Sequence, residues 1–338
     1  MYYSSEFATT RKRINYLLIS LAQRIKSKRV IAYPVKLTVC PGNVCNLKCV
    51  LCPVGQVDGG REKGLMEFRT FKKLIDECGP YLYELDLYNW GEPLLNKDVF
   101  EMVRYAKKYK IKISISSNLR YFDEKICTEL IKTGVDHLII SLDGTSQESV
   151  GKYQVGNDFV EVVSNMKKIV RKKRELNSIK PFVQWRFLVT RHNEDEIEEA
   201  EALAKEIGVD KLEITIFRCD MGSELLLNDK EQFENVQEWL PESETLSKYD
   251  YSNKAKKTHS VNGCSWLWTQ STINWNGSVS PCCAVWHEKF DFGNINRNSF
   301  WQIWNNKKYQ DARRANRGDN VDTSGNICHI CYLNKATL

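Results

Sequence analysis

Three cysteines in the first sixth of the chain have the types and spacing to do chemistry. Cys45, Cys49 and Cys52 form a C-x3-C-x2-C array directly after the apolar stretch 35–39. Three thiolates this close can bind three corners of a [4Fe-4S] cube. No nearby fourth cysteine lies at ligand spacing, so one iron would stay open to a non-protein ligand. A structural zinc site would need four closed ligands, and no histidine occurs near this loop. The array therefore predicts a reactive iron-sulfur site.

The elements that must position this loop follow a repeating βα pattern. Short β-rich runs alternate with amphipathic stretches, which is typical of parallel strands covered by helices. The pattern predicts strands at 35–40, 83–88, 111–117, 136–142, 182–189 and 211–217, and helices near 69–78, 97–109, 123–133, 158–175 and 194–207. Six such units predict an α/β fold, a partial (β/α)6 TIM-like barrel. Its active-site residues are expected at the carboxyl ends of the strands, where the cysteine loop also lies.

Small and polar residues stand where later strands end. Gly91, Glu92 and Pro93 follow the second strand, in a turn that lets the backbone approach a ligand and exposes carbonyls to an ammonium group. Residues suited to hydrogen-bond ribose hydroxyls or a carboxylate end the third and fourth strands: Ser116, Ser117, Asn118, Ser141 and Asp143. Each could equally serve as a helix N-cap or a turn residue. Arg186 on the fifth strand either faces the cavity and pairs with a carboxylate, or forms an outward salt bridge.

Taken in order, the cysteine array, the Gly-Glu-Pro turn and the polar strand ends resemble the radical S-adenosylmethionine (radical SAM) superfamily. The resemblance implies that the triad cluster binds S-adenosylmethionine and cleaves it to methionine and a 5′-deoxyadenosyl radical, which takes a hydrogen atom from a substrate C–H bond. The strand-end residues named above would contact this cosubstrate. Related sequences commonly carry an arginine in a Tyr-Arg pair where this chain has Tyr153-Gln154, which leaves Lys152 or Arg186 as the partner of the methionyl carboxylate.

A second cysteine set lies near the C-terminus, where tryptophans are also frequent. It comprises Cys264, the pair Cys282-Cys283, and Cys328 with Cys331. The spacing resembles the twitch form of the SPASM extension of radical SAM enzymes, in which four cysteines close an auxiliary [4Fe-4S] cluster. On this resemblance we assign Cys264, Cys282, Cys328 and Cys331 as ligands, with Cys283 as the rival of Cys282. Four thiolates would also suit zinc.

One further thiol, Cys219, follows the sixth predicted strand and can reach the barrel mouth. An S–H group is a ready hydrogen-atom donor, and in epimerases of the superfamily a cysteine quenches the substrate radical. The resemblance makes Cys219 a candidate for that role, and a buried bystander is the alternative. If the auxiliary cluster instead accepts an electron from the substrate radical, the outcome is an oxidation or a crosslink.

The resemblance thus implies an oxidoreductase or epimerase that acts on a carbohydrate-like or peptide substrate and takes electrons from an external donor such as flavodoxin or ferredoxin. A peptide-crosslinking or maturation enzyme is the alternative within the superfamily. The alternative of another class is a non-catalytic iron-sulfur protein that transfers electrons or binds a partner. A pure electron carrier would normally supply the fourth ligand that the triad lacks.

Composition narrows the class of protein further. The formal net charge of +6 over 338 residues is mild, and the charges are scattered, so we expect no nucleic-acid partner. The sequence has no apolar run long enough to span a membrane and no signal-peptide pattern. Twelve cysteines in such a chain favour metal ligation over disulfides, and we expect a cytoplasmic protein.

An N-terminal segment completes the predicted organisation. Residues 11–29 have the pattern of a basic amphipathic helix whose apolar face carries Ile14, Leu17, Leu18, Leu21 and Ile25. That face either packs against the barrel or meets a membrane surface. We expect four parts: this helix (1–34), the radical SAM barrel (35–217), a bridging segment (218–262) and the auxiliary-cluster domain (263–338).

Overall fold

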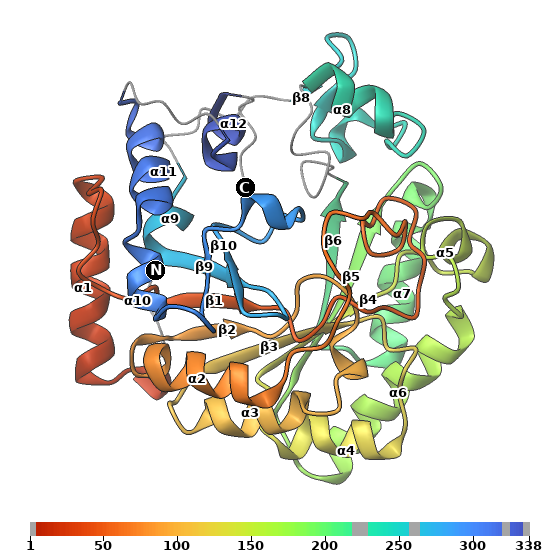
Figure 1. Cartoon of the computed structure of the whole chain (residues 1–338). Coiled ribbons are helices and arrows are strands. Elements are labelled where there is room, and N and C mark those ends of the chain that lie inside the picture. The colour runs from red at the N-terminus through yellow and green to blue at the C-terminus, as the bar shows by residue number, and fades with distance from the viewer. Residues whose placement is uncertain (1–4, 218–228, 257–263, 320–324, 334–338) are drawn as a thin grey trace.

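One nine-stranded sheet organises the molecule. The computed structural model describes residues 5–217, 229–256, 264–319 and 325–333. Six parallel strands follow one another in chain order: β1 (Lys36–Val39), β2 (Glu84–Asp86), β3 (Lys112–Ser117), β4 (His137–Ser141), β5 (Phe182–Val189) and β6 (Lys211–Ile216). The sheet curves and stays open beyond β6, so the predicted partial barrel is confirmed (Figure 1).

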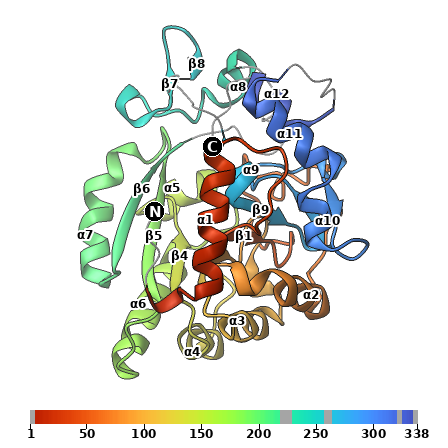
Figure 2. The same ribbon diagram turned by 90° about the vertical axis from the view of Figure 1, so that its left-hand side faces the viewer.

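Helices cover the outer face of this sheet (Figures 1 and 2). They are α2 (Phe68–Cys78), α3 (Val99–Lys107), α4 (Glu124–Lys132), α6 (Phe159–Glu175) and α7 (Ile197–Ile207). Alternation along each strand explains the layering. In β3, Ile113 and Ile115 are buried in the core, while Ser114 and Ser116 face the interior of the barrel. Every strand and helix predicted between residues 35 and 217 is present.

One helix of the barrel was not predicted. Helix α5 (Gln147–Tyr153) follows β4 and begins at a capping box between Ser146 and Ser149. With two turns it is too short to show an apolar period in the sequence. The described residues also include short 3-10 helices: η1 (Ser5–Phe7), η2 (Gly79–Tyr81), η3 (Pro93–Leu95), η4 (Glu194–Glu196), η6 (Glu244–Leu246) and η7 (Glu288–Phe290).

The C-terminal strands extend the barrel sheet rather than forming a sheet of their own. β9 (Gln270–Ile273) pairs in parallel with β1, and β10 (Ser278–Ser280) and β11 (Gly293–Asn294) continue antiparallel. Around them lie α9 (Trp266–Thr269), α10 (Phe300–Trp304), α11 (Lys307–Arg317) and α12 (Ile327–Leu333). The bridging part contributes α8 (Asp229–Val236) and the small sheet of β7 (Tyr249–Asp250) and β8 (Ala255–Lys256).

The C-terminal tryptophans anchor this part to the barrel. Trp268 Nε1 donates to the Ser27 carbonyl at 2.8 Å, and Trp304 Nε1 donates to the Ala32 carbonyl at 3.1 Å. The Arg313 guanidinium stacks on the Trp304 ring at 4.5 Å. The crowding of tryptophans therefore reflects a packed junction with the segment that precedes β1.

Helix α1 (Thr10–Arg24) packs on the domain through a different face from the one that the sequence predicts. Its buried residues are Lys12, Asn15, Ile19 and Ala22. Lys12 Nζ donates to the carbonyls of residues 109 and 110 at 2.8 and 2.7 Å, and the Asn15 amide pairs with both backbone groups of Tyr33. Of the predicted apolar face only Leu18 packs against the core, and Ile14, Leu17, Leu21 and Ile25 are exposed. The prediction that this face packs against the barrel is therefore wrong for these four residues, because the surface under α1 presents backbone polar groups that need polar partners.

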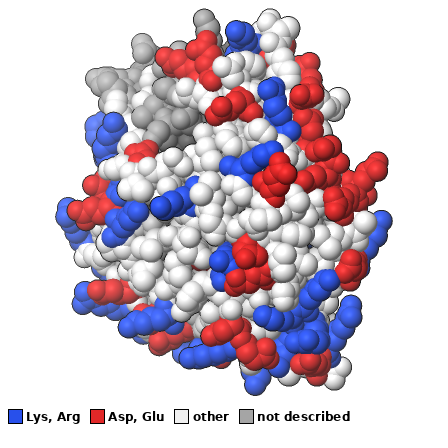
Figure 3. Space-filling view, turned by 90° about the vertical axis from the view of Figure 1, so that its right-hand side faces the viewer, with Lys and Arg blue, Asp and Glu red and all other residues white. Residues whose placement is uncertain are grey.

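The surface charge and the apolar character of the helices also bear on the sequence-based expectations. Basic and acidic side chains are intermixed on the face of the barrel that Figure 3 shows. In the part of the chain that the structure describes, no helix combines the length and the apolar character needed to cross a bilayer.

Candidate functional site

The triad loop follows β1, at the carboxyl end of the strand. Cys45, Cys49 and Cys52 are free and partly exposed. Burial raises the pKa of Cys49, and the nearby Cys52, Asp143 and Cys45 raise it further. Burial likewise raises the pKa of Cys45 to about 11. Three thiols whose charged forms repel one another need a bound cation before they can ionise together, which is what an iron-sulfur cluster provides.

Close backbone packing shapes this loop. A side chain at Gly55 would meet the Cys49 carbonyl at 2.5 Å, and Gln56 Nε2 donates to the same carbonyl at 3.0 Å. Gly91 has φ +81° and lies so close to the loop that a Cβ there would meet the Gly42 carbonyl at 2.6 Å. Glycine is therefore required where the turn after β2 approaches the triad loop.

The carboxylate of Glu92 ties the end of β2 to the end of β3. Its Oε1 accepts from the Ser117 hydroxyl at 2.8 Å, and its Oε2 accepts from the backbone N–H of Asn118 at 2.8 Å. Pro93 follows at the start of η3, where Leu94 N–H also donates to Glu92. Burial raises the pKa of Glu92 to about 7, although these hydrogen bonds oppose the rise. In this structure Glu92 and Ser117 thus position the two strand ends.

Asn118 connects the end of β3 to the triad. Its Nδ2 donates to Asn46 Oδ1 at 2.9 Å and lies 3.8 Å from Cys45 Sγ. The Leu47 backbone N–H donates to the same sulfur at 3.4 Å. N–H groups directed at a cysteine sulfur stabilise its thiolate and tune the potential of a cluster that it holds.

Arg186, in the middle of β5, joins the ends of β3 and β4. Its Nη2 donates to Ser116 Oγ at 2.9 Å and to Ser141 Oγ at 2.8 Å. Arg186 faces the interior of the barrel, because its neighbours Trp185 and Phe187 point to the buried core. Among the described residues Arg186 makes inward hydrogen bonds and not the outward salt bridge that was considered for it.

Asp143 lies close enough to Arg186 and Cys49 for their charges to interact, whereas Lys152 lies apart from this group. Asp143 Oδ1 accepts from the Leu188 N–H at 2.9 Å, and burial raises the pKa of Asp143 to about 6. Lys152 is an exposed residue of α5 whose Nζ pairs with Glu148 at 3.3 Å. Sequence reasoning missed Gln154, which is buried and joins the Asp143 N–H to the Ser141 carbonyl. Its only signal was its place beside Tyr153, where relatives commonly carry arginine.

The C-terminal cysteines lie close enough together for their charges to interact. Burial raises the pKa of Cys282 well above its usual range, and the neighbouring sulfurs of Cys283, Cys328, Cys331 and Cys264 raise it further. Cys283 also acts on residues inside the barrel: burial opposes the charge of Lys36, while Asp86, Glu84 and Cys283 raise its pKa. The predicted hydrogen-atom donor Cys219 lies outside the described residues.

Two indole N–H groups beside the triad bear on whether a cluster fits there. Trp90 and Trp286 are buried, with ring centroids 5.4 Å apart, and pack in one apolar cluster with Cys45 and Cys52. Neither indole nitrogen has a hydrogen-bond partner in the part of the chain that the structure describes. Thiolate and sulfide sulfurs are acceptors, so the residues present fit an iron-sulfur cluster.

A buried ion pair holds Trp286 at this position. Arg61, which follows the triad loop, forms a bidentate pair with Asp291 at 2.8 Å, and its Nε donates to the Trp286 carbonyl at 2.9 Å.

Among the described residues, no three His, Cys, Asp or Glu side chains lie close enough to share a single metal ion. In a cube each thiolate binds a different iron.

The fold and the two cysteine sets define an iron-sulfur protein on a partial barrel, and comparison with known families specifies the class. The radical SAM superfamily model matches residues 39–203, and the model of SPASM, an iron-sulfur cluster-binding domain, matches residues 264–332. The chain belongs to the radical SAM superfamily and carries a C-terminal SPASM domain. The two domains imply the cofactors predicted above: a cluster that binds S-adenosylmethionine, an auxiliary cluster, and S-adenosylmethionine itself.

Similar proteins come from distant organisms. The chain is 26% identical over 296 residues to the tungsten-containing aldehyde ferredoxin oxidoreductase cofactor-modifying protein of Pyrococcus furiosus, covering 78% of this chain and 79% of that protein. It is 26% identical over 293 residues to the mycofactocin maturase MftC of Mycobacterium tuberculosis, covering 82% and 72%. The structure of Streptococcus suis SuiB bound to S-adenosylmethionine has the same fold, with a TM-score of 0.61, 16% identity, and coverage of 87% of this chain and 70% of that chain.

Proposed function

We propose that this radical SAM protein abstracts a hydrogen atom from a C–H bond of a peptide or carbohydrate-like substrate, and that the substrate is oxidised. When bound, the triad cluster supplies the electron that cleaves S-adenosylmethionine. The observation that carries the proposal is the meeting of Arg186 with Ser116 and Ser141 inside the barrel, at the same strand ends as the triad loop. This arrangement offers a cation and two hydroxyls to a small zwitterion beside the cluster.

The proposed contacts to the cosubstrate follow from this geometry. Arg186 is proposed as the partner of the methionyl carboxylate, because its guanidinium is held at the ends of β3 and β4 inside the barrel. The backbone carbonyls of the turn at Gly91 are proposed to accept from the amino group. Glu92, Ser117 and Asp143 support these contacts by fixing the strand ends.

Oxidation is favoured over epimerisation by the position of the second cysteine set. β9 pairs directly with β1, and Cys283 influences the pKa of Lys36 within the barrel. An auxiliary cluster held next to Cys283 would lie beside the substrate space and could accept an electron from the substrate radical. Epimerisation would need a hydrogen-atom donor such as Cys219, which lies outside the described residues.

A peptide is the substrate class that the relatives favour. One relative is named a maturase, and SuiB, which has the same fold, has been solved bound to the precursor peptide SuiA. Peptide crosslinking or maturation is therefore the second candidate function. In either case we propose an external donor such as flavodoxin or ferredoxin as the source of electrons.

The test of this function is nucleoside formation by the anaerobically reconstituted protein. With dithionite and S-adenosylmethionine, we expect 5′-deoxyadenosine on chromatography, and a candidate peptide should lose two hydrogen atoms per turnover. Nucleoside formation without any substrate oxidation, but with exchange of solvent deuterium into the peptide, would favour epimerisation. No nucleoside at all would favour the non-catalytic electron-transfer or binding protein.

Replacing Arg186 should weaken binding of S-adenosylmethionine much more than replacing Lys152. A charge-assisted pair contributes about 1.5–3 kcal/mol, so Arg186→Gln is expected to raise the dissociation constant about ten- to hundredfold. Lys152→Gln removes an exposed i,i+4 pair worth about 0.3–0.5 kcal/mol and should leave the constant within about twofold. Equilibrium dialysis of the reconstituted variants measures both, and the reverse order would exclude Arg186 as the carboxylate partner.

A further inference from the structure

Helix α1 exposes a continuous apolar face. Ile14, Leu17, Leu21 and Ile25 are 54%, 67%, 56% and 61% exposed, and Ile31 beside them is 72% exposed. The first four recur every three or four residues, so they share one face of the helix. Because Lys12 and Asn15 fix the opposite face to the barrel by hydrogen bonds, α1 cannot turn this apolar face inward without losing them.

The charges that α1 and the residues directly after it place around this face have one sign, and the nearby Glu77 carboxylate accepts from the Tyr33 hydroxyl at 3.3 Å. Exposed arginines flank it, with Arg11 on one side and Arg13 and Arg24 on the other, and exposed Lys28 and Arg29 follow the helix. From residue 7 to residue 57 the sequence contains no Asp or Glu. An apolar face that is bordered by basic side chains of the same segment complements a membrane with anionic lipids, whose interior is apolar and whose surface is negatively charged.

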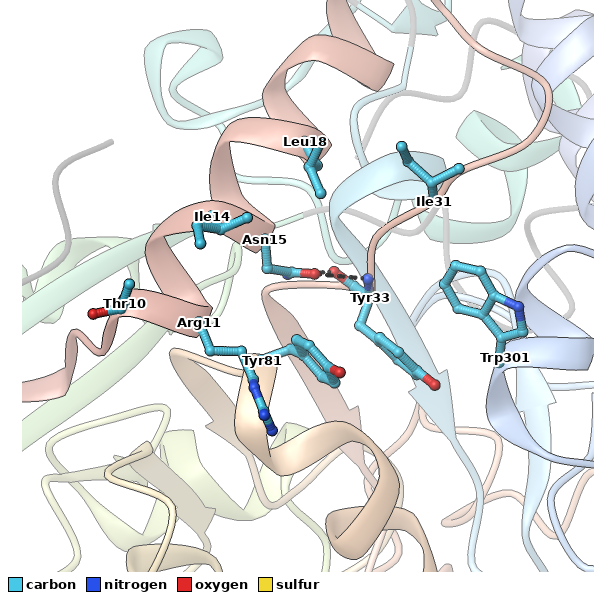
Figure 4. Close-up of a pocket in the computed structure, with 9 residues that line it drawn as sticks. All are labelled: Thr10, Arg11, Ile14, Asn15, Leu18, Ile31, Tyr33, Tyr81 and Trp301. Carbon is cyan, nitrogen blue, oxygen red and sulfur yellow. Dashed lines mark hydrogen bonds between the residues drawn. The ribbon is translucent and has the colours of Figure 1, made fainter.

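A groove beside α1 also combines apolar and aromatic side chains with an arginine. It has a volume of about 560 Å³ and lies between α1 and the aromatic rings of Tyr33, Tyr81 and Trp301 (Figure 4). Tyr33 stacks on Tyr81 with ring centroids 4.4 Å apart and meets Trp301 at 5.0 Å. The Arg11 guanidinium lies 5.9 Å from the Tyr81 ring. Tyrosine and tryptophan suit the boundary between lipid tails and head groups, and arginine pairs with phosphate.

We propose that the apolar face of α1 and this groove form a docking surface for an anionic phospholipid membrane. The face made by Ile14, Leu17, Leu21, Ile25 and Ile31 inserts among the acyl chains. The flanking arginines pair with lipid phosphates. The helix lies in the plane of the membrane surface and does not cross it. The proposal stands apart from the proposed function, since it depends on no residue of the cysteine sites or of the Arg186 group.

Vesicle flotation of the full chain tests this surface. Wild-type protein is expected to float with phosphatidylcholine vesicles that contain phosphatidylglycerol, to bind pure phosphatidylcholine vesicles far more weakly, and to be released by high salt. The double variant Leu17→Glu, Leu21→Glu should lower the bound fraction by about tenfold or more. Both side chains are exposed, so the variant should fold normally, which circular dichroism checks.

Val160→Glu is the matched control, because Val160 is 71% exposed on the distant helix α6. It should bind vesicles as the wild type does. Absence of binding to phosphatidylglycerol vesicles at low salt would overturn the proposal, as would equal binding to neutral vesicles. A dimer in solution that the double variant abolishes, without vesicle binding, would assign the face to a second copy of the chain and also overturn it.

Discussion

Replacing any one of Cys45, Cys49 or Cys52 with alanine is expected to abolish formation of 5′-deoxyadenosine. Each is proposed to supply one corner of the cluster that holds S-adenosylmethionine, and within the matched radical SAM region no further cysteine lies at ligand spacing to replace it. Loss of groups that merely support a metal ligand costs ten- to hundredfold in affinity or activity, so loss of a ligand should cost more than about a hundredfold.

A cysteine of the same barrel provides the control. Cys127 is fully buried in α4, on the outer face of the sheet, where it serves as a small core residue. Cys127→Ala should cost about 1 kcal/mol of stability and leave both iron content and nucleoside formation intact. The measurements are iron per chain and chromatography after incubation with dithionite and S-adenosylmethionine. Wild-type nucleoside formation by a triad variant would remove that cysteine from the site.

The sequence predicted the barrel well, and the reason is physical. Parallel strands that are covered by helices need apolar residues on the outer face, so runs such as 111–117 and 182–189 are strongly β-rich and bounded by polar turns. The cysteine triad was equally easy to recognise in the sequence, because cluster ligation fixes both residue type and spacing. The comparisons confirm the family and the fold, and the three cysteines as cluster ligands stay a prediction.

The parts that sequence reasoning missed depend on contacts between distant segments. The apolar period of α1 suggested its buried face, but the helix meets backbone carbonyls that only Lys12 and Asn15 can satisfy. The sequence also did not show that the Glu92 carboxylate accepts from Ser117 and Asn118, whereas the cofactor contact of this turn stays a prediction. Trp286 stands some 230 residues after the triad in the sequence, and only the Arg61 pair with Asp291 brings it beside Cys45. Local patterns carry no signal for such pairings.

The Arg61 side chain also connects the segments that carry the two cysteine sets. Arg61 is buried, and it binds Asp291 and the Trp286 carbonyl a few residues after Cys282 and Cys283. Asn89, at the end of the β2 region, donates to the Cys283 carbonyl at 3.2 Å. The second set is therefore held against the barrel by contacts from the triad side, which gives an auxiliary cluster a fixed place relative to the substrate space.

Cys282→Ala is expected to remove the auxiliary cluster, whereas Cys283→Ala should not. Cys282 is partly buried beside the sulfurs of the other C-terminal cysteines, and the Cys283 thiol also influences Lys36 inside the barrel. Iron analysis of the wild type should give about eight irons per chain, falling to about four in Cys282→Ala and remaining at about eight in Cys283→Ala. The remaining triad cluster in Cys282→Ala should still support some cleavage of S-adenosylmethionine.

Two results would contradict this ligand set. Loss of four irons in Cys283→Ala, but not in Cys282→Ala, would exchange the two cysteines. About four irons and one zinc in the wild type would replace the auxiliary cluster with a closed zinc site, which four thiolates also suit. A zinc ion has no redox chemistry, so that outcome would leave no acceptor next to the barrel and would exclude oxidation through this site.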